Sequence, residues 1–481
     1  MNKIINSLLH RYRSVSVEVR AAFWYTICNV LLKAISLITV PIFTRILSEA
    51  DYGVVGVYTG WRDIIFIFGT LNLFYSAYNT AIIKYKKDID AFTSSMIGLI
   101  DFITFSLVII YLCGRSYFEQ LFEMPSKLML IILAELLTVP AYNFWMTKER
   151  FKYNYRNVVL VTLGISICAP ILSLVLVILS AENKAFYRIL GITLPTILVG
   201  CVISIMFIFK GGKLFNREYW IYGLRFNLPL IPHYLSGTVL NQSDRIMISK
   251  LISVDKAGIY SVAYSAALTI TIVTSAINQS LTPWLYKKLK ESNYMSIKRR
   301  TNQILLVIAS ILALFILVVP EVVSILAPSS YQEAVGILPV LVMSVYFQFL
   351  YGFFGTVDFY FEKSLYPMLA SVIAAVVNLI TNYFFIPMWG YLAAGYTTLF
   401  SFIIMAIMHY FFMRFVLFKE RIKDSVFDIK TIIMLSVLFS VVGFGESLLY
   451  VFPIIRYFIA ITLLLILVYK RERIISIIKE S

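Results

Sequence analysis

Long apolar runs alternate with short polar segments along almost the whole chain of 481 residues. A helix needs about 20 apolar residues to cross the hydrocarbon layer, and runs of that length predict about fourteen transmembrane helices. The connecting segments are short, so little of the chain remains for a soluble domain. The pattern predicts an all-α polytopic membrane protein whose spans centre on residues 21–43, 54–80, 91–113, 127–146, 158–180, 188–209, 219–243, 257–283, 302–327, 334–357, 365–387, 391–413, 429–450 and 453–469.

The seventh expected span contains a segment that is unusual for a lipid-facing helix. "LPLIPHYLSGTVLNQSDR", residues 228–245, has two prolines and ends in a polar run. At membrane depth such a segment is tolerated only against protein or water. Two consecutive polar spans favour a cavity, although hydroxyl and amide groups also join neighbouring helices directly. The second polar span is the eighth, whose stripe at helical spacing comprises Ser261, Tyr264, Thr271, Thr274, Asn278 and Thr282.

Composition and charge support a membrane protein and indicate its orientation. The chain is 60% hydrophobic and only 14% charged, whereas soluble domains contain about 25% charged residues. Basic residues collect in alternate connecting segments, including "YKKLKESNYMSIKRR" and the N-terminal Lys3, Arg11 and Arg13. Because basic loops stay in the cytoplasm, both termini are expected there, with an even number of spans. This bias accounts for most of the net charge of +16 without a nucleic-acid partner, and it also favours contact with anionic membrane lipids.

Cysteines and histidines give no sign of a metal or redox site. The four cysteines are scattered through apolar runs without the spacing of metal ligands, and three histidines are far apart. We expect no metal, no cofactor and no cleaved signal peptide. The residues are Cys28, Cys113, Cys168 and Cys201, with His10, His233 and His409.

An internal repeat relates the two halves of the chain. When "FTRILSEADYGVVGVY" (43–58) is laid over "ISKLISVDKAGIYSVA" (248–263), Ser48 meets Ser253 and Gly53 meets Gly258. The order of such matches predicts six-span lobes over residues 1–210 and 211–425, followed by two further spans over 426–481. An even number of spans preserves orientation, so the lobes are expected to be parallel repeats that alternate access by rocking. Gly53 itself is expected in a turn.

Ionisable residues inside spans are costly and therefore informative. The first half contains Lys33, Arg62, Asp63, Asp101 and Glu135, and the seventh span contains Arg225. Lys33, Asp101 and Glu135 have similar depths at about 1.5 Å per residue, so we expect that they can meet. A set of buried pairs that only stabilises the bundle is the alternative for each of them. Near span ends, Glu321 and Asp358 are expected to be solvated.

Three segments resemble the bacterial polysaccharide transporter family, the Wzx-type O-antigen and capsule flippases of the MOP superfamily. They are "PIFTRILSEADYGVVGVY", "LIPHYLSGTVLNQSDRIMISKLISVDKAGIYSVAY" and "AAVVNLITNYFFIPMWGYLAAGYTTLFSF". The third has "GYLAAGY" where the family often has a Gly-Ala-Ala run. The resemblance implies translocation of undecaprenyl-pyrophosphate-linked oligosaccharide from the cytoplasmic to the periplasmic leaflet of the bacterial inner membrane. It further implies a non-enzymatic protein that works beside a polysaccharide polymerase and a chain-length regulator.

Roles for the candidate residues follow from this implied substrate. Cationic side chains match phosphate oxygens, so Arg225, Lys33 and Arg62 are candidates for the pyrophosphate. Carboxylates are candidates for coupling to H⁺ or Na⁺, namely Asp101, Glu135 and Asp63, and the amides Asn241 and Asn278 are candidate substrate contacts.

Two other functions remain open. A drug or organic-cation exporter of the same superfamily would have a more acidic and less basic cavity. A multispan polymerase or glycosyltransferase would need a carboxylate base, but the "SEAD" loop (48–51) is too short for a donor site. The sequence contains no glycine-rich phosphate-binding loop, which argues against an ATP motor.

Overall fold

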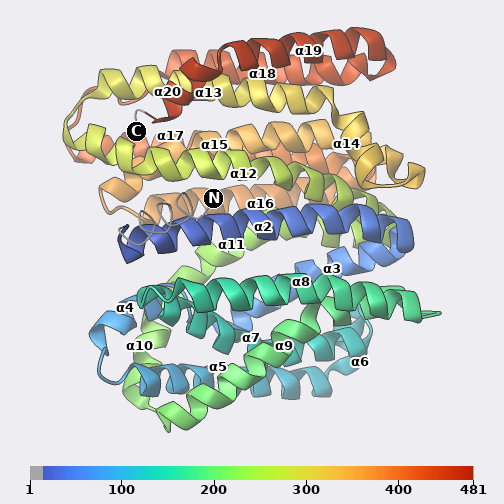
Figure 1. Ribbon diagram of the computed structural model, residues 1–481, viewed down its shortest axis with the longest axis vertical. Coiled ribbons are helices and arrows are strands. Elements are labelled where there is room, and N and C mark those ends of the chain that lie inside the picture. Colours follow the sequence, from blue (N-terminus) through green and yellow to red (C-terminus); the bar gives the residue numbers. More distant parts are fainter. Residues whose placement is uncertain (1–14, 480–481) are drawn as a thin grey trace, which may run out of the picture. The chain divides into compact units, whose positions relative to one another are not determined.

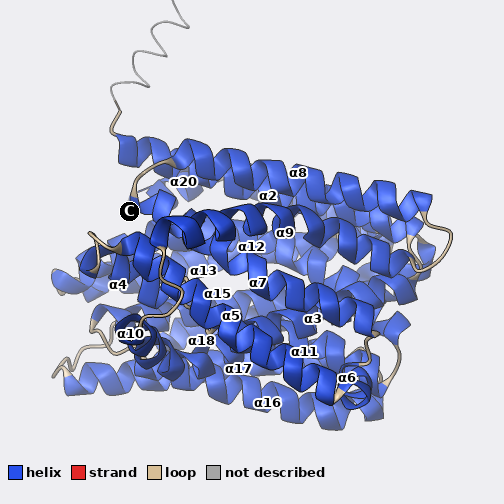
Figure 2. Cartoon of the chain, turned by 90° about the horizontal axis from the view of Figure 1, so that it is seen from below, coloured by secondary structure: helices blue, strands red, loops and turns tan. Residues whose placement is uncertain are grey.

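The computed structural model describes residues 15–479, and every regular element in that range is a helix (Figures 1 and 2). His10, Lys3, Arg11 and Arg13 lie outside the described residues. Eleven of the described helices are long and apolar enough to cross a membrane, which confirms the all-α polytopic class. They are α2 (Val17–Ile46), α5 (Ile89–Cys113), α7 (Ser126–Phe151), α8 (Tyr155–Leu179), α9 (Lys184–Gly211), α12 (Val254–Lys290), α13 (Tyr294–Leu317), α15 (Leu338–Tyr360), α16 (Leu365–Trp389), α17 (Ala393–Lys419) and α18 (Ile429–Leu448) with η3 (Leu449–Val451).

Three of the expected spans are not among these eleven helices, because they are interrupted, more polar or shorter. The run 54–80 divides into α3 (Glu49–Thr70) and α4 (Ser76–Lys84), joined by a turn with positive φ at Leu71 and Asn72. The run 219–243 divides into α10 (Arg217–Asn227), the short η1 (Leu228–Leu230) and α11 (Ile231–Leu251). Pro229 and Pro232 lack the amide hydrogen that an uninterrupted helix needs. The last span, α19 (Pro453–Tyr469), has 17 residues.

The remaining elements are short. They are α6 (Arg115–Phe122), α14 (Val319–Leu326), η2 (Ser329–Gly336) and α20 (Arg471–Lys479). Two compact units divide the chain: one contains Tyr58–Tyr234 and the chain up to Ile46, and the other contains Leu47–Val57 and Leu235–Ser481.

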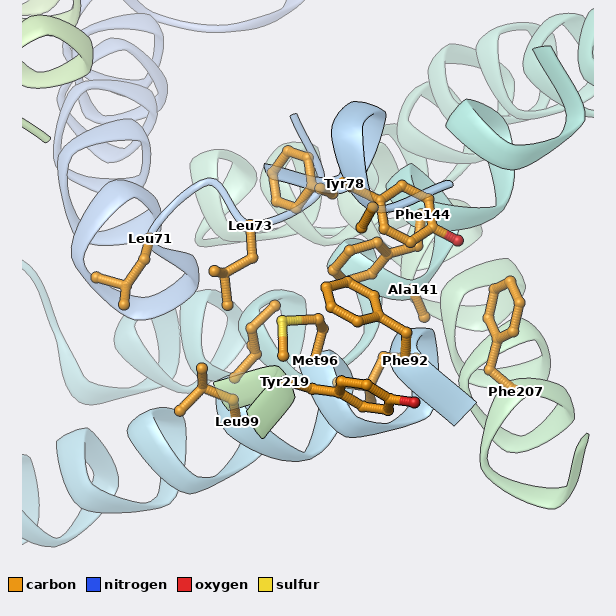
Figure 3. Close-up of a cluster of buried hydrophobic side chains, with 14 of the residues drawn as sticks. Leu71, Leu73, Tyr78, Phe92, Met96, Leu99, Ala141, Phe144, Phe207 and Tyr219 are labelled. Carbon is orange, nitrogen blue, oxygen red and sulfur yellow. The ribbon is translucent and has the colours of Figure 1, made fainter. Parts of the chain in front are cut away.

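An aromatic core holds the first unit together and fixes α10 (Figure 3). The ring of Tyr78 on α4 lies 4.7 Å from that of Phe144 on α7, and its hydroxyl is 2.7 Å from the Thr93 hydroxyl. Phe92 on α5 is 5.2 Å from Tyr219 on α10. Ring pairs at these distances stabilise beyond their buried area. The result is a firm base for α10, which carries Arg225.

In the second unit, α15 packs against both α12 and α17, with α16 against α17 and α18 against α13 (Figure 1). Helix α15 is buried along nearly its whole length. A helix that is apolar on all sides suits this central position.

The two glycines matched by the repeat form a reciprocal close contact. A Cβ on Gly53 would lie 2.0 Å from the Val254 carbonyl oxygen, and a Cβ on Gly258 would lie 2.1 Å from the Glu49 carbonyl oxygen. The expectation that Gly53 forms a turn was wrong, since it lies inside α3. Glycine is required there because the starts of α3 and α12 approach backbone to backbone.

Replacing Gly258 with alanine should lower the melting temperature of the purified protein, because the obstacle is rigid backbone. Overpacking of this kind costs about 1–3 kcal/mol. Gly445→Ala on α18 is the control, because nothing lies within 4 Å of its added Cβ. In a helix that control should stabilise by up to about 1 kcal/mol. Equal shifts for the two variants in a thermal unfolding experiment would refute the contact.

Candidate functional site

A cavity of about 300 Å³ lies among α12, α15 and α17 in the second unit. Two glycines on α15 open it: a Cβ on Gly352 would lie 3.3 Å from the Asn278 amide nitrogen, and one on Gly355 would lie 3.1 Å from the His409 ring. Residues three apart share one helix face, so both glycines are directed to the same space. The lining residues are Asn278, Gln279, Thr282, Tyr351, Gly352, Gly355, Thr356, Phe359 and His409.

The lining combines aromatic faces with neutral polar groups. The Tyr351 ring stacks on His409 with centroids 4.9 Å apart, and His409 is 3% exposed. The side-chain amides of Asn278 and Gln279 can each donate and accept hydrogen bonds. No carboxylate, lysine or arginine is among the lining residues. Such a surface suits a neutral molecule with many hydroxyl groups, whose C–H faces can pack on aromatic rings.

A second polar cluster in this unit is buried and internally satisfied. Asp244 on α11 is 1% exposed and accepts hydrogen bonds from the Tyr260 hydroxyl, from Thr398 Oγ1 at 2.6 Å and from Asn382 Nδ2 at 2.6 Å. Ser243 donates to Asn378 Oδ1 at 2.9 Å. The cluster thus joins α11, α12, α16 and α17. For Ser243 and Asp244, direct hydrogen bonding between helices is the correct one of the two alternatives that the sequence left open.

Other polar residues of these two spans join helices, line the cavity or bond within their own helix. Asn241, a candidate substrate contact, accepts a hydrogen bond from the Tyr264 hydroxyl at 2.6 Å and donates to the Gly237 carbonyl at 2.6 Å. It therefore belongs to the helix-joining side, whereas Asn278 and Thr282 line the cavity. Thr271 and Thr274 donate to carbonyls of their own helix.

The first unit contains an ionic cluster between α3 and α7. Arg62 Nη2 lies 2.9 Å from Glu135 Oε1, and Arg62 Nη1 lies 3.0 Å from Asp63 Oδ1. The Tyr58 hydroxyl donates to Glu135 Oε2 at 2.7 Å. The Glu135 side chain is 3% exposed, against 29% for Arg62. A charge at that depth requires a partner, and Arg62 provides it.

The other candidate ions stand apart from this cluster. Lys33 on α2 and Arg225 on α10 are exposed, and Asp101 on α5 is half-buried. Within residues 15–479, none of the three takes part in an ion pair. The expected grouping of Lys33, Asp101 and Glu135 is not observed as ion pairs, because equal depth does not determine which face of a helix a side chain occupies.

The expectation of solvation near span ends was wrong for Asp358 and only partly met by Glu321. Asp358 is 0% exposed, and neither of its carboxylate oxygens has a hydrogen-bond partner among the described residues. Glu321 on α14 forms an ion pair with Arg456 of α19 at 2.5 Å. Hydrogen bonding from the Arg456 guanidinium holds the pKa of Glu321 below its usual value. This pair attaches α19 to α14, and Arg456 also donates to the Leu317 carbonyl at the end of α13 at 2.7 Å.

The cavity residues on α15 and α17 were missed by sequence reasoning. His409 was considered only as a metal ligand, and "YGFFG" (351–355) was read as part of an apolar span. The pair of glycines three residues apart, beside a tyrosine, is the signal that would have indicated an opening in that helix face.

Long apolar helices define a multi-pass membrane protein, and solved structures of transporters share this fold. The lipid II flippase MurJ in an inward closed conformation aligns with a TM-score of 0.67 at 17% identity, covering 94% of this chain and 99% of that one. An inward-facing multidrug resistance MATE family transporter of the MOP superfamily aligns with a TM-score of 0.57 at 13% identity, covering 82% and 96%.

The chain belongs to the polysaccharide biosynthesis protein family, whose model matches residues 19–289. The resemblance drawn from the sequence is thereby confirmed. A relative from Haemophilus influenzae, "Lsg locus putative protein 1", is 39% identical over 70 residues. That match spans 15% of this chain and 18% of the relative.

Proposed function

We propose that this protein is a flippase for oligosaccharide units carried on undecaprenyl pyrophosphate. It moves O-antigen or capsule repeat units from the cytoplasmic to the periplasmic leaflet of a bacterial inner membrane, with both termini in the cytoplasm. The observation that carries the proposal is the cavity lined by Asn278, Tyr351 and His409, because its amides and rings suit a sugar. Membership of the polysaccharide biosynthesis family and the fold shared with a lipid flippase support it.

Charged residues take the other tasks in this proposal. Arg225 and Lys33 are exposed and outside any ion pair of the described residues, so they are available to a pyrophosphate. Arg62 is already matched by Glu135 and Asp63, which makes this cluster, together with Asp101, the better candidate for coupling to H⁺ or Na⁺. Polymerase and chain-length regulator are the partners that would receive the exported unit.

The lipid tail is assigned to an apolar groove of about 420 Å³ among α13, α18 and α19. Leu306, Phe439 and Phe458 are among its lining residues, and Glu446 is the one carboxylate that faces it. An undecaprenyl chain is wholly apolar, so a groove of this kind can hold a segment of it while the head group crosses.

Asn278→Leu and Tyr351→Ala should each lower surface glycan about 10-fold or more. An unmatched polar contact costs about 1–3 kcal/mol, and a lost aromatic contact costs about 1 kcal/mol besides its area. The assay is complementation of a strain that lacks its own flippase, scored for surface polysaccharide and for protein in the membrane. Thr271→Val and Tyr383→Ala are matched controls: the Thr271 hydroxyl bonds only its own helix in the described structure, and Tyr383 on α16 is 61% exposed.

The same strains separate this function from drug export. An organic-cation exporter would use acidic groups, which the cavity lining lacks. Wild-type glycan in both cavity variants, together with raised sensitivity to cationic drugs, would favour the exporter.

A further inference from the structure

A basic pocket is lined by residues of α12, α13 and α20. Helix α20 packs against both α12 and α13, near the turn that joins them (Figure 1). The volume of the pocket is about 450 Å³. None of its eight lining residues is acidic. Four are cationic, namely Lys288, Arg299, Arg300 and Arg473, and the other four are Trp284, Ser296, Gln303 and Ser476.

Within the pocket the cations are only partly balanced. Lys288 forms an ion pair with Glu291 at 2.6 Å, and the Arg300 guanidinium lies 4.6 Å from the centre of the Trp284 ring. Arg299 and Arg473 are exposed and form no ion pair with any residue in the described part of the chain. Like charges gathered around one cavity repel each other, so the arrangement is most stable when an anion occupies it.

We propose that this pocket binds the phosphate group of an anionic phospholipid head group. Guanidinium groups match phosphate oxygens in a two-pronged geometry, and Ser296, Gln303 and Ser476 add hydroxyl and amide donors. Both α12 and α13 are candidate membrane spans, and α20 follows directly after the apolar α19. The pocket is therefore placed at the ends of membrane helices, where basic pockets take lipid head groups.

Two lining residues of the pocket have an exposed apolar neighbour in the sequence, which favours a lipid over a free anion. Met295, next to Ser296, is 75% exposed, and Ile475, next to Ser476, is 45% exposed. Free phosphate cannot shield apolar side chains from water, whereas acyl chains attached to the bound head group would cover them. Occupation of the pocket would hold α20 against α12 and α13. This inference is independent of the transported substrate.

The test uses the full-length protein in detergent, titrated with phosphatidylglycerol while its melting temperature is followed. Stabilisation should saturate with phosphatidylglycerol and be absent with phosphatidylcholine. The double variant Arg299→Gln/Arg473→Gln should need about 30-fold more phosphatidylglycerol for the same shift. Both residues are exposed, so the variant should fold normally without lipid.

Lys287→Gln/Lys290→Gln is the matched control, because it removes two charges from the same end of α12 outside the pocket. It should respond to phosphatidylglycerol almost as the wild type does. Equal weakening in both double variants would mean a diffuse surface attraction and would overturn the pocket. Equal stabilisation by phosphatidylglycerol and phosphatidylcholine would overturn the anion requirement. Full stabilisation by inorganic phosphate or pyrophosphate alone would overturn the lipid assignment.

Discussion

Arg225→Ala should abolish surface glycan while leaving the protein folded and inserted. A pyrophosphate must cross a layer in which each uncompensated charge costs several kcal/mol, so loss of its counter-charge should slow translocation about 100-fold or more. Arg225 is exposed on α10, which the aromatic core anchors, and its loss removes no ion pair within the described residues. The measurement is surface polysaccharide in a complemented strain, normalised to protein in the membrane.

Two further variants make this result specific. Arg225→Lys should keep partial function, because the charge survives while the two-pronged geometry is lost. Arg217→Ala is the matched control, since Arg217 is also exposed on α10 but lies at its first turn. Wild-type glycan in Arg225→Ala would place the cationic site elsewhere, and Lys33→Ala would then be the next variant to score.

Arg62→Met should destabilise the first unit by about 3 kcal/mol, because it leaves the Glu135 carboxylate buried with only the Tyr58 hydroxyl. Glu135→Gln should cost less, since Arg62 keeps Asp63 at 3.0 Å. The double variant Arg62→Met/Glu135→Gln should recover much of the loss, because no uncompensated buried charge remains. Thermal unfolding of the four proteins in detergent gives the coupling energy of the pair.

Transport by the double variant separates two roles of the cluster. If the ions only stabilise the unit, the double variant should export glycan at nearly the wild-type rate. If the cluster couples export to an ion gradient, stability should return while export stays low. Additive losses in unfolding, with no recovery in the double variant, would contradict the pairing itself.

The sequence by itself determined the membrane class, most of the spans and the family. These properties depend on local runs of apolar residues and on short motifs, which a chain carries wherever its helices are packed. The match of Gly53 with Gly258 also came from the sequence, but the reason that both positions require glycine did not. Only the approach of the Glu49 and Val254 backbones explains why both positions are glycine.

The tertiary structure decided which polar residues meet. Helical periodicity gives the depth of a residue along a helix, but the partner depends on how that helix is rotated against its neighbours. Glu135 therefore meets Arg62 rather than Lys33, and Asp244 meets groups from three other helices. The cavity was likewise decided by the tertiary structure. Its residues Asn278, Tyr351 and His409 lie on three separate helices, and only the packing of these helices brings them to one space.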